Sequence, residues 1–170
     1  MFEIKVLGYD EAKTSYLSGW PTKIISLIKQ DMPNWGENHI RVQFDDVHNP
    51  LAGYVHPTEY HFQRILDFTK DLTDDDKVLV HCIAGISRST SAAIAILIQH
   101  GMSYVDAYNH ISHQRPHLAP NRMIVEYTDD HFGLGGEYYI FVEERIPFKH
   151  ITGWFKGLIG NDVPLIGAKD

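Results

Sequence analysis

The fold is decided by residues 78–89, which read Val78-Leu79-Val80-His81-Cys82-Ile83-Ala84-Gly85-Ile86-Ser87-Arg88-Ser89. The apolar run at residues 78–80 predicts a buried strand that leads directly into Cys82. From Ser89 to His100 the sequence is rich in alanine, isoleucine and leucine, which predicts a buried helix, and Gly101 is well placed to end it. A strand, a tight glycine-containing turn and a helix therefore bracket Cys82, which is typical of an α/β domain.

The turn at residues 83–87 has the composition of an anion-binding loop. A tight loop that enters a helix points successive backbone N–H groups into one concavity, and a phosphate monoester dianion needs many such donors at once. Gly85 tolerates backbone conformations that other residues resist, and the small Ala84 lets a ligand approach. The planar guanidinium of Arg88 can hold two phosphate oxygens together. The residues expected to bind phosphate are Ile83, Ala84, Gly85, Ile86, Ser87 and Arg88.

Cys82 is the only cysteine in the chain, and a lone cysteine is by default a small buried apolar residue. Its neighbours change this interpretation, because an electropositive cradle stabilises a thiolate over the thiol. The thiolate would be a nucleophile directed at phosphorus. The hydroxyl of Ser89 is placed to hydrogen-bond the sulfur and to ease its departure. His81 is expected to orient the loop from behind.

The rest of the chain predicts alternating strands and helices. From apolar and alternating runs, strands are predicted at residues 2–6, 23–28 and 39–44. From caps and apolar faces, helices are predicted from Asp10, from Pro57, over residues 103–112 and over residues 120–132. The expected fold class is α/β, a single domain whose mostly parallel central sheet is flanked by helices.

Composition limits the class of protein. The chain has 170 residues, 44% of them hydrophobic, which suits one compact folded domain. A net charge of -7 argues against a nucleic-acid binder. No apolar stretch is long enough to span a membrane, the N-terminus lacks the order of a signal peptide, and a single cysteine allows no disulfide. We therefore expect a cytoplasmic protein without a membrane span.

Residues 78–89 resemble the signature of cysteine-dependent protein tyrosine and dual-specificity phosphatases, in which His-Cys after a strand is followed by five residues and Arg-Ser. Residues 84–89 are most similar to the dual-specificity branch, and the chain length suits that branch and its small bacterial and phage-borne members. The resemblance covers roughly residues 4–132. We therefore divide the chain into a phosphatase domain at residues 1–135 and a C-terminal extension at residues 136–170. We expect this extension to pack on the domain, although its aromatic residues 154–155 could instead anchor on a membrane or a partner.

The resemblance also implies a general acid on a loop upstream of the cysteine, which protonates the leaving oxygen and later deprotonates the attacking water. Asp46 falls at this position when the strand at residues 40–44 is aligned with the family pattern, and Asp45 is the alternative. Either aspartate could instead be a turn residue or a helix cap. In relatives, an asparagine after a proline braces the phosphate loop. Asn121 has this place, and as a residue before a helix it could equally be a simple cap.

Together these residues predict hydrolysis of a phosphomonoester through a cysteinyl-phosphate, without a metal or another cofactor. The expected substrate is a protein or peptide carrying phosphotyrosine, with phosphoserine or phosphothreonine also open. The loop contains no lysine, which lipid-directed relatives often carry, but a lipid or nucleotide phosphate stays open as an alternative.

The same residues bear on other classes of protein. The rival from another class is a catalytically silent phosphate-binding module. His110 and His113 would share a helix face, yet no third metal ligand is evident beside them. A rhodanese is disfavoured because its loop is typically shorter. A low-molecular-weight phosphatase is disfavoured because its cysteine lies near the N-terminus, whereas Cys82 lies in the middle of the chain. The sequence leaves the oligomeric state open.

Overall fold

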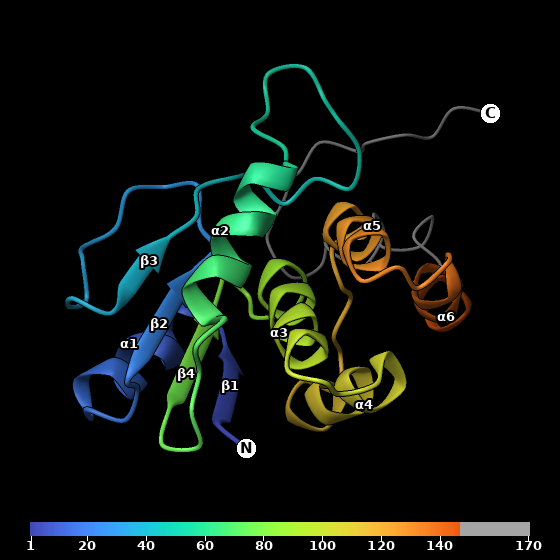
Figure 1. Cartoon of the computed structure of the whole chain (residues 1–170). Coiled ribbons are helices and arrows are strands. Elements are labelled where there is room, and N and C mark those ends of the chain that lie inside the picture. The colour runs from blue at the N-terminus through green and yellow to red at the C-terminus, as the bar shows by residue number, and fades with distance from the viewer. Residues whose placement is uncertain (147–170) are drawn as a thin grey trace.

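The computed structural model describes residues 1–146 of the chain, which form one α/β domain (Figure 1). In chain order the elements are β1 (Glu3–Leu7), α1 (Tyr9–Leu17), β2 (Lys23–Ser26), β3 (His39–Arg41), α2 (Glu59–Thr69), β4 (Lys77–His81), α3 (Arg88–Gln99), α4 (Tyr104–Gln114), α5 (Arg122–His131) and α6 (Glu137–Arg145). The strands form one sheet in the order β1-β4-β2-β3, and every neighbouring pair is parallel. This confirms the predicted fold class.

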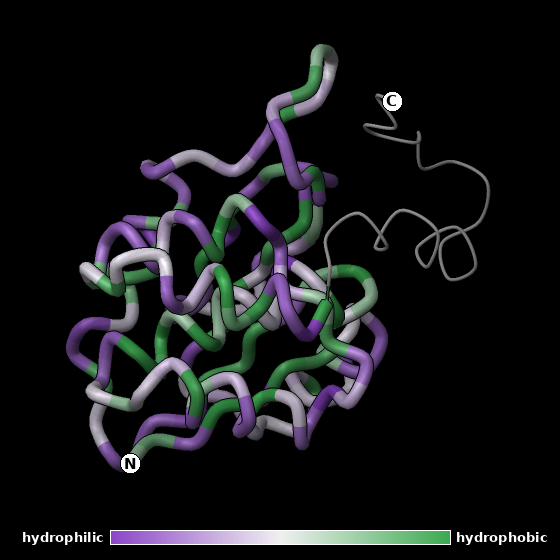
Figure 2. Tube along the Cα trace, turned by 90° about the vertical axis from the view of Figure 1, so that its right-hand side faces the viewer, coloured by the Kyte–Doolittle hydropathy of each residue, from purple (hydrophilic) through white to green (hydrophobic). Residues whose placement is uncertain are grey.

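The strand that leads to the cysteine, β4, lies inside the sheet between β1 and β2. Val78 and Val80 face the main core, which α2, α3, α4 and α5 cover. Leu79 faces the opposite side and packs in a smaller core with Ala12 of α1 and Trp35. Burial on both faces explains why this strand is a continuous apolar run rather than an alternating one. Figure 2 shows hydrophobic stretches running through the interior of the domain.

Helix α3, which follows the loop after β4, is buried on nearly all sides. Its residues from Ala92 to Leu97 are at most 1% exposed, as expected for a helix that is apolar all round. Gly101, with φ of +91°, follows the end of the helix. The helix spans 12 residues. Within residues 1–146, neither this helix nor any other is both long and apolar enough to cross a bilayer.

Several predicted boundaries were wrong. Strand β2 ends at Ser26 rather than at residue 28, and two further errors lie on the segment between β3 and α2. The ladder of β3 ends at Arg41 rather than Phe44, because the chain then leaves the sheet edge and buries Val42 and Phe44 in the main core. Helix α2 does not begin at Pro57. Its N-cap is Thr58, whose side-chain oxygen accepts a hydrogen bond from the His61 N–H. A threonine can satisfy this free amide of the first turn, whereas the side chain of Pro57 has no oxygen to do so. The loop between these elements projects from the domain in both views (Figures 1 and 2).

Helix α6 lies within the segment that we assigned to a C-terminal extension. Tyr138 and Val142, one turn apart, are fully buried, and Phe141 packs edge-on against Tyr104 and Tyr108 of α4. The carboxylate of Asp129 accepts hydrogen bonds from the first amides of the helix. This part of the segment therefore packs on the domain. Residues 154–155, named above as a possible anchor, lie outside the described residues, and the boundary at residue 135 stays a prediction.

Candidate functional site

The loop between β4 and α3 makes a tight turn that requires glycine at one position. Gly85 has φ of +69°, in the left-handed region that residues with a Cβ avoid. A Cβ added there would lie 2.6 Å from Gly8 N and 2.6 Å from Leu7 C, both of which are backbone atoms. The loop thus presses its outer side against the end of β1, and only glycine fits at the contact.

The carbonyl groups of residues 83–86 all accept hydrogen bonds from outside the loop. Ile83 O accepts from the Tyr9 N–H, Ile86 O accepts from the Ala119 N–H, and the two carbonyls between them accept from Arg115, each at 2.9 Å. In a trans peptide the C=O and the next N–H point in opposite directions. The amides of residues 84–87 are therefore directed to the inner side, which makes the concave set of donors that an anion needs.

Arg115 is a residue whose role the sequence analysis missed. Its guanidinium donates to Ala84 O and Gly85 O and pairs with Glu11 at 3.0 Å, and Glu11 in turn accepts from the Gly8 N–H at 2.9 Å. One side chain thus fixes the orientation of two peptides of the loop. No sequence pattern near Arg115 indicates this contact, because the loop that it bonds lies 30 residues away in the chain.

Cys82 lies at the bottom of the loop and is 2% exposed. Its Sγ accepts a hydrogen bond from the Gly85 N–H at 3.2 Å, and Ser89 Oγ lies 3.2 Å from the sulfur. These are the groups that can stabilise a thiolate and assist its departure. The structure therefore brings Cys82 and Ser89 together, as the sequence analysis expected.

Arg88, the first residue of α3, carries a buried charge whose hydrogen bonds are incomplete among the described residues. Its side chain is 7% exposed, and one guanidinium nitrogen donates to Phe44 O at 2.8 Å. Its Nε has no hydrogen-bond partner among the described residues, and the nearest carboxylate oxygen, Asp46 Oδ2, is 3.9 Å away. A buried guanidinium left in this state is costly unless an anion completes its hydrogen bonds.

The two consecutive aspartates point to different places. Asp46 turns toward the loop, where its Oδ1 accepts from the Ser87 hydroxyl at 2.7 Å. Asp45 turns away, accepts from the Val55 N–H at 2.8 Å, and pairs with Lys29 at 3.1 Å. Asp45 thus anchors the projecting loop, whereas Asp46 borders the cradle. This geometry favours Asp46 of the two candidates.

Asn121 caps α5 and also binds the aspartate loop. Its Oδ1 accepts from the Met123 and Ile124 N–H groups, and its Nδ2 donates to Asp46 Oδ1 at 2.9 Å and to Val47 O at 3.0 Å. Asn121 is thus a helix cap, and its role as a brace of the phosphate loop stays a prediction. The side-chain oxygen of Asn121 bonds the helix and its nitrogen bonds the segment that carries Asp46. Asn121 is therefore linked to the phosphate loop through Asp46, which accepts a hydrogen bond from Ser87.

His81 lies behind the loop, as expected, and is fully buried. Its Nδ1 is 3.3 Å from Cys82 O, and its ring stacks on Trp35 with centroids 5.0 Å apart. Burial lowers the pKa of His81 from 6.5 to about 4, against a smaller opposing effect of the hydrogen bond to Cys82. The imidazole is therefore neutral near pH 7.

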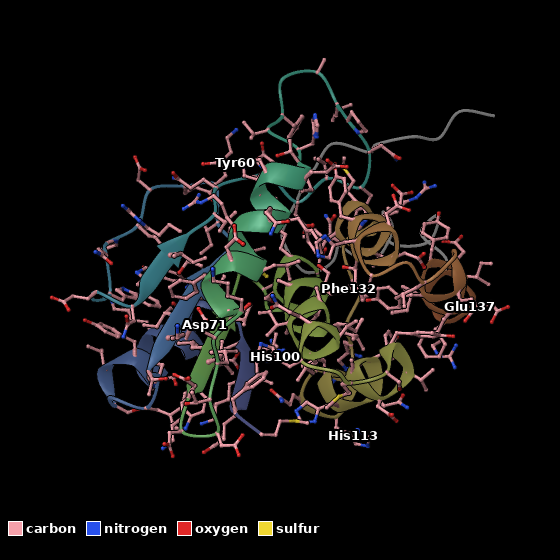
Figure 3. The ribbon with its side chains drawn as sticks, viewed as in Figure 1. Tyr60, Asp71, His100, His113, Phe132 and Glu137 are labelled. Atoms are coloured by element: carbon pink, nitrogen blue, oxygen red, sulfur yellow. The ribbon has the colours of Figure 1, made fainter. Side chains whose placement is uncertain are left out.

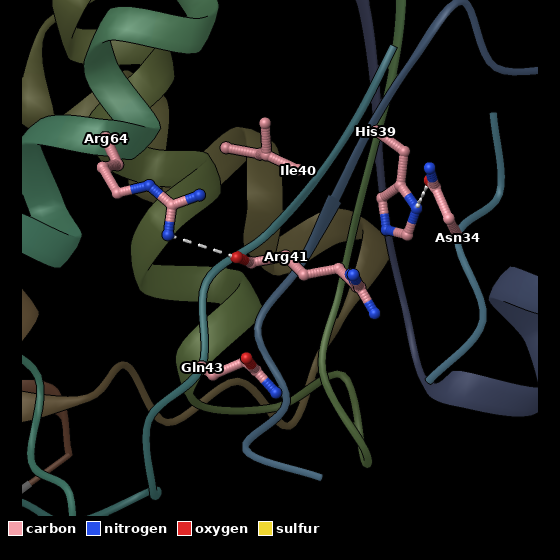
Figure 4. Close-up of a pocket in the computed structure, with 6 residues that line it drawn as sticks. All are labelled: Asn34, His39, Ile40, Arg41, Gln43 and Arg64. Carbon is pink, nitrogen blue, oxygen red and sulfur yellow. Dashed lines mark hydrogen bonds between the residues drawn. The ribbon is translucent and has the colours of Figure 1, made fainter. Parts of the chain in front are cut away.

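The part of the chain that the structure describes holds no cluster of metal ligands beside this loop. Within residues 1–146, no three His, Cys, Asp or Glu side chains come together in a way that could hold a metal ion. His113 lies on the outer side of α4 (Figure 3), where its Nδ1 donates to Asn109 O at 2.6 Å. A hollow of about 360 Å³ at the sheet edge (Figure 4) is lined by Asn34, His39, Ile40, Arg41, Gln43 and Arg64, so it is separate from the loop.

The comparisons with known proteins agree with this geometry. Residues 22–130, which include β4, the loop and α3, match the model of the dual specificity phosphatase catalytic domain. The chain belongs to the dual-specificity phosphatase family. Over 98 residues it is 35% identical to dual specificity protein phosphatase 14 of mouse, a match that covers 54% of this chain and 50% of that protein. The chain thus spans about half the length of this curated relative.

Solved structures share the fold of this dual-specificity phosphatase domain. The crystal structure of DUSP15 matches with a TM-score of 0.61 at 22% identity, covering 86% of this chain and 94% of that one. A human tyrosine phosphatase-like serine/threonine/tyrosine-interacting protein also matches with a TM-score of 0.61, at 23% identity, covering 78% of this chain and 92% of that one. At this level of identity the two matches establish the fold.

Proposed function

We propose that the chain hydrolyses phosphomonoesters through a cysteinyl-phosphate intermediate. The observation that carries the proposal is the buried guanidinium of Arg88, whose Nε has no hydrogen-bond partner among the described residues and which follows the inward amides of the loop after Cys82. A phosphoryl group would complete the hydrogen bonds of Arg88 and of the loop together. As charge develops on its oxygens, these fixed donors stabilise it without reorganising.

In the first step, the Cys82 thiolate attacks phosphorus in line, so that a P–S bond forms while the P–O bond to the leaving group breaks. Asp46 enters this step as the carboxylic acid and gives its proton to the leaving oxygen. Because Oδ1 already accepts from Ser87 and Asn121, we assign the mobile proton to Oδ2.

In the second step, water attacks the cysteinyl-phosphate and the Asp46 carboxylate takes its proton. The P–S bond breaks, phosphate leaves, and the sulfur regains its charge. Ser89, whose hydroxyl is 3.2 Å from the sulfur, donates to the departing thiolate. No step needs a metal ion or another cofactor.

The proposed substrate is a phosphorylated protein or peptide, carrying phosphotyrosine and also phosphoserine or phosphothreonine. The loop offers uncharged side chains at its mouth, where Ile83 is 43% exposed, and contains no lysine that would favour a polyanionic lipid headgroup. The mouse relative is named a dual specificity protein phosphatase. A lipid or nucleotide phosphate is the alternative substrate. A cytoplasmic location, where the lone thiol stays reduced, belongs to the same proposal.

The test compares hydrolysis of an aryl phosphate by the wild type, Cys82→Ser and Arg88→Lys. We expect no measurable turnover with Cys82→Ser and a loss of about 10- to 100-fold in kcat/KM with Arg88→Lys, because lysine cannot make the bidentate contact. A panel of phosphotyrosine, phosphothreonine and phosphoinositide substrates then separates the substrate classes. An inactive wild type that binds tungstate would instead support a silent phosphate-binding module.

A further inference from the structure

A line of hydrogen bonds runs through the core from the sheet edge to the carbonyl of the cysteine. The Trp35 N–H donates to His39 Nδ1 at 2.8 Å, and His39 Nε2 lies 2.7 Å from Ser26 Oγ. Ser26 Oγ lies 2.5 Å from His81 Nε2, and His81 Nδ1 faces Cys82 O. Ser26 is 1% exposed, so its hydroxyl has no water to replace either histidine.

The direction of every bond in this line follows from its two ends. A backbone N–H can only donate, so His39 Nδ1 is an acceptor and its proton lies on Nε2, which donates to Ser26. At the other end a carbonyl can only accept, so the proton of His81 lies on Nδ1. Ser26 therefore accepts from one histidine and donates to the other. Asn34 Oδ1 lies 3.0 Å from His39 Nδ1 (Figure 4). Two acceptors cannot bond each other, so this assignment exchanges the oxygen and nitrogen of the Asn34 amide and makes its Nδ2 the donor to the ring.

Both imidazoles must be neutral for the line to hold, and their surroundings keep them so. Burial, with the charge of Arg41 on the same strand, lowers the pKa of His39 from 6.5 to about 4. Burial affects His81 in the same way, the charges of His39 and Arg88 add to it, and the hydrogen bond to the Cys82 carbonyl opposes it. The ring of Tyr9 also faces His81, with centroids 6.0 Å apart.

Aromatic stacking fixes the planes of the two rings. Trp35 stacks on His81 at 5.0 Å and on His39 at 5.8 Å, with an interplanar angle of 23° in each case. On the same indole, Tyr16 stacks at 5.2 Å and 5°. The rings are thus held in the orientations that the hydrogen bonds require.

We propose that His39 is a positioning residue for the cysteine, acting through Ser26 and the tautomer of His81. With its proton on Nδ1, His81 holds Cys82 O on the outer side of the loop. The following amide, Ile83 N–H, then faces the inner side, because the two groups of a trans peptide point in opposite directions. Without the Ser26 donor, His81 is free to move its proton to Nε2 and to turn a lone pair toward Cys82 O. The thiolate and the transferring phosphoryl group then lose an ordered donor.

The inference deepens the proposed function, on which it depends for the effect on turnover, but its first test needs no turnover. Since the chain has one cysteine, its alkylation by iodoacetamide reports on Cys82 alone. In His39→Phe and in Ser26→Ala we expect the midpoint of the rate-against-pH profile to rise by about half to one pH unit, the size of one net hydrogen bond. In His39→Gln, whose amide can still donate to Ser26, the midpoint should stay within about 0.2 units of the wild type.

A structural role alone gives a different pattern. Ile28→Ala removes packing from the same small core at a residue that is not part of the line, so it should lower the Tm and leave the midpoint unchanged. Nitrogen chemical shifts of His81 should show the proton on Nδ1 in the wild type and a mixture of tautomers in Ser26→Ala. An unchanged midpoint in both His39→Phe and Ser26→Ala would overturn the inference, as would a wild-type His81 protonated on Nε2. If alkylation behaves as expected but no aryl phosphate is hydrolysed, only the proposed function fails.

Discussion

Asp46 and Asn121, 75 positions apart in the sequence, are joined by a 2.9 Å hydrogen bond from Nδ2 to Oδ1. The same asparagine caps α5 with its other side-chain atom. The proposed general acid is therefore held by the last helix of the matched domain, and its position depends on tertiary structure rather than on its own loop.

Two substitutions of Asn121 should separate its role as a helix cap from its contact with Asp46. Asn121→Ser keeps an oxygen for the helix amides and loses the donor to Asp46, so kcat should fall about tenfold with little change in stability. Asn121→Ala should lose the same activity and in addition about 0.5 to 2 kcal/mol of unfolding free energy. Aryl phosphate kinetics and urea unfolding measure the two effects. Equal stability of the two variants would contradict the assignment of the cap.

The two neighbouring aspartates should differ in their effect on the leaving group. Asp46→Asn should reduce kcat by roughly 100-fold or more on a substrate with a poor leaving group, because a general acid contributes about that much. The reduction should shrink as the leaving group becomes more acidic. Asp45→Asn should cost less than tenfold and act mainly by loosening the contacts with Lys29 and Val55. A larger loss in Asp45→Asn would transfer the role of the acid to Asp45.

The turn at Gly85 offers a stability test with an internal control. Gly85→Ala must adopt a positive φ and also place a Cβ against the backbone of Leu7 and Gly8, so it should cost at least about 3 kcal/mol of unfolding free energy. Gly19→Ala has a similar φ of +73° but open space around its Cβ, and should cost about 1 to 2 kcal/mol. Urea denaturation distinguishes the two. Similar losses would mean that the loop does not press on β1 in solution.

The buried histidines predict a stability that falls in mild acid. The pKa values of His39 and His81 are lowered from 6.5 to about 4 in the folded protein, so between these values the unfolded chain binds protons that the folded one does not. The contribution of these two histidines to the unfolding free energy is therefore fully present above about pH 6.5 and is lost as the pH is lowered toward 4. We expect a loss of roughly 2 to 3 kcal/mol between about pH 7.5 and pH 5, with the partly exposed His39 contributing less than His81.

The control for this pH dependence is His39→Gln. Between about pH 7.5 and pH 5 its unfolding free energy should fall by about 1 kcal/mol less than that of the wild type. His48 and His61, whose pKa values burial also lowers, add to the loss in both proteins and cancel in the comparison. Identical pH dependence of the two proteins in urea unfolding would show that His39 titrates normally in the fold.

The local features of the domain were predictable from the sequence, because short-range rules determine them. The strand, turn and helix around Cys82 follow from consecutive residues, and Gly85 is required by the turn itself. The orientation of Asp46 toward the loop agrees with the family alignment. By contrast, residue type alone does not decide where α2 begins. Pro57 suits a first helical position and Thr58 suits an N-cap, and in the structure Thr58 is the N-cap.

The remaining features depend on contacts between distant segments. Arg115 reaches the loop across 30 positions, and Ser26 meets His81 across 55, so neither contact leaves a local pattern. Helix α6 was not predicted because its buried residues Tyr138 and Val142 are few and its other residues are mixed. Such positions become interpretable only once the sheet order places their strands side by side.

The central claim is that Cys82 carries the phosphoryl group during turnover, and peptide mapping of protein quenched in acid during aryl phosphate hydrolysis tests it most directly. With one cysteine in the chain, the account predicts a single added phosphoryl group on the peptide that contains Cys82, and none in Cys82→Ser. Hydrolysis by Cys82→Ser at the wild-type rate, or a phosphoryl group on another residue, would contradict it.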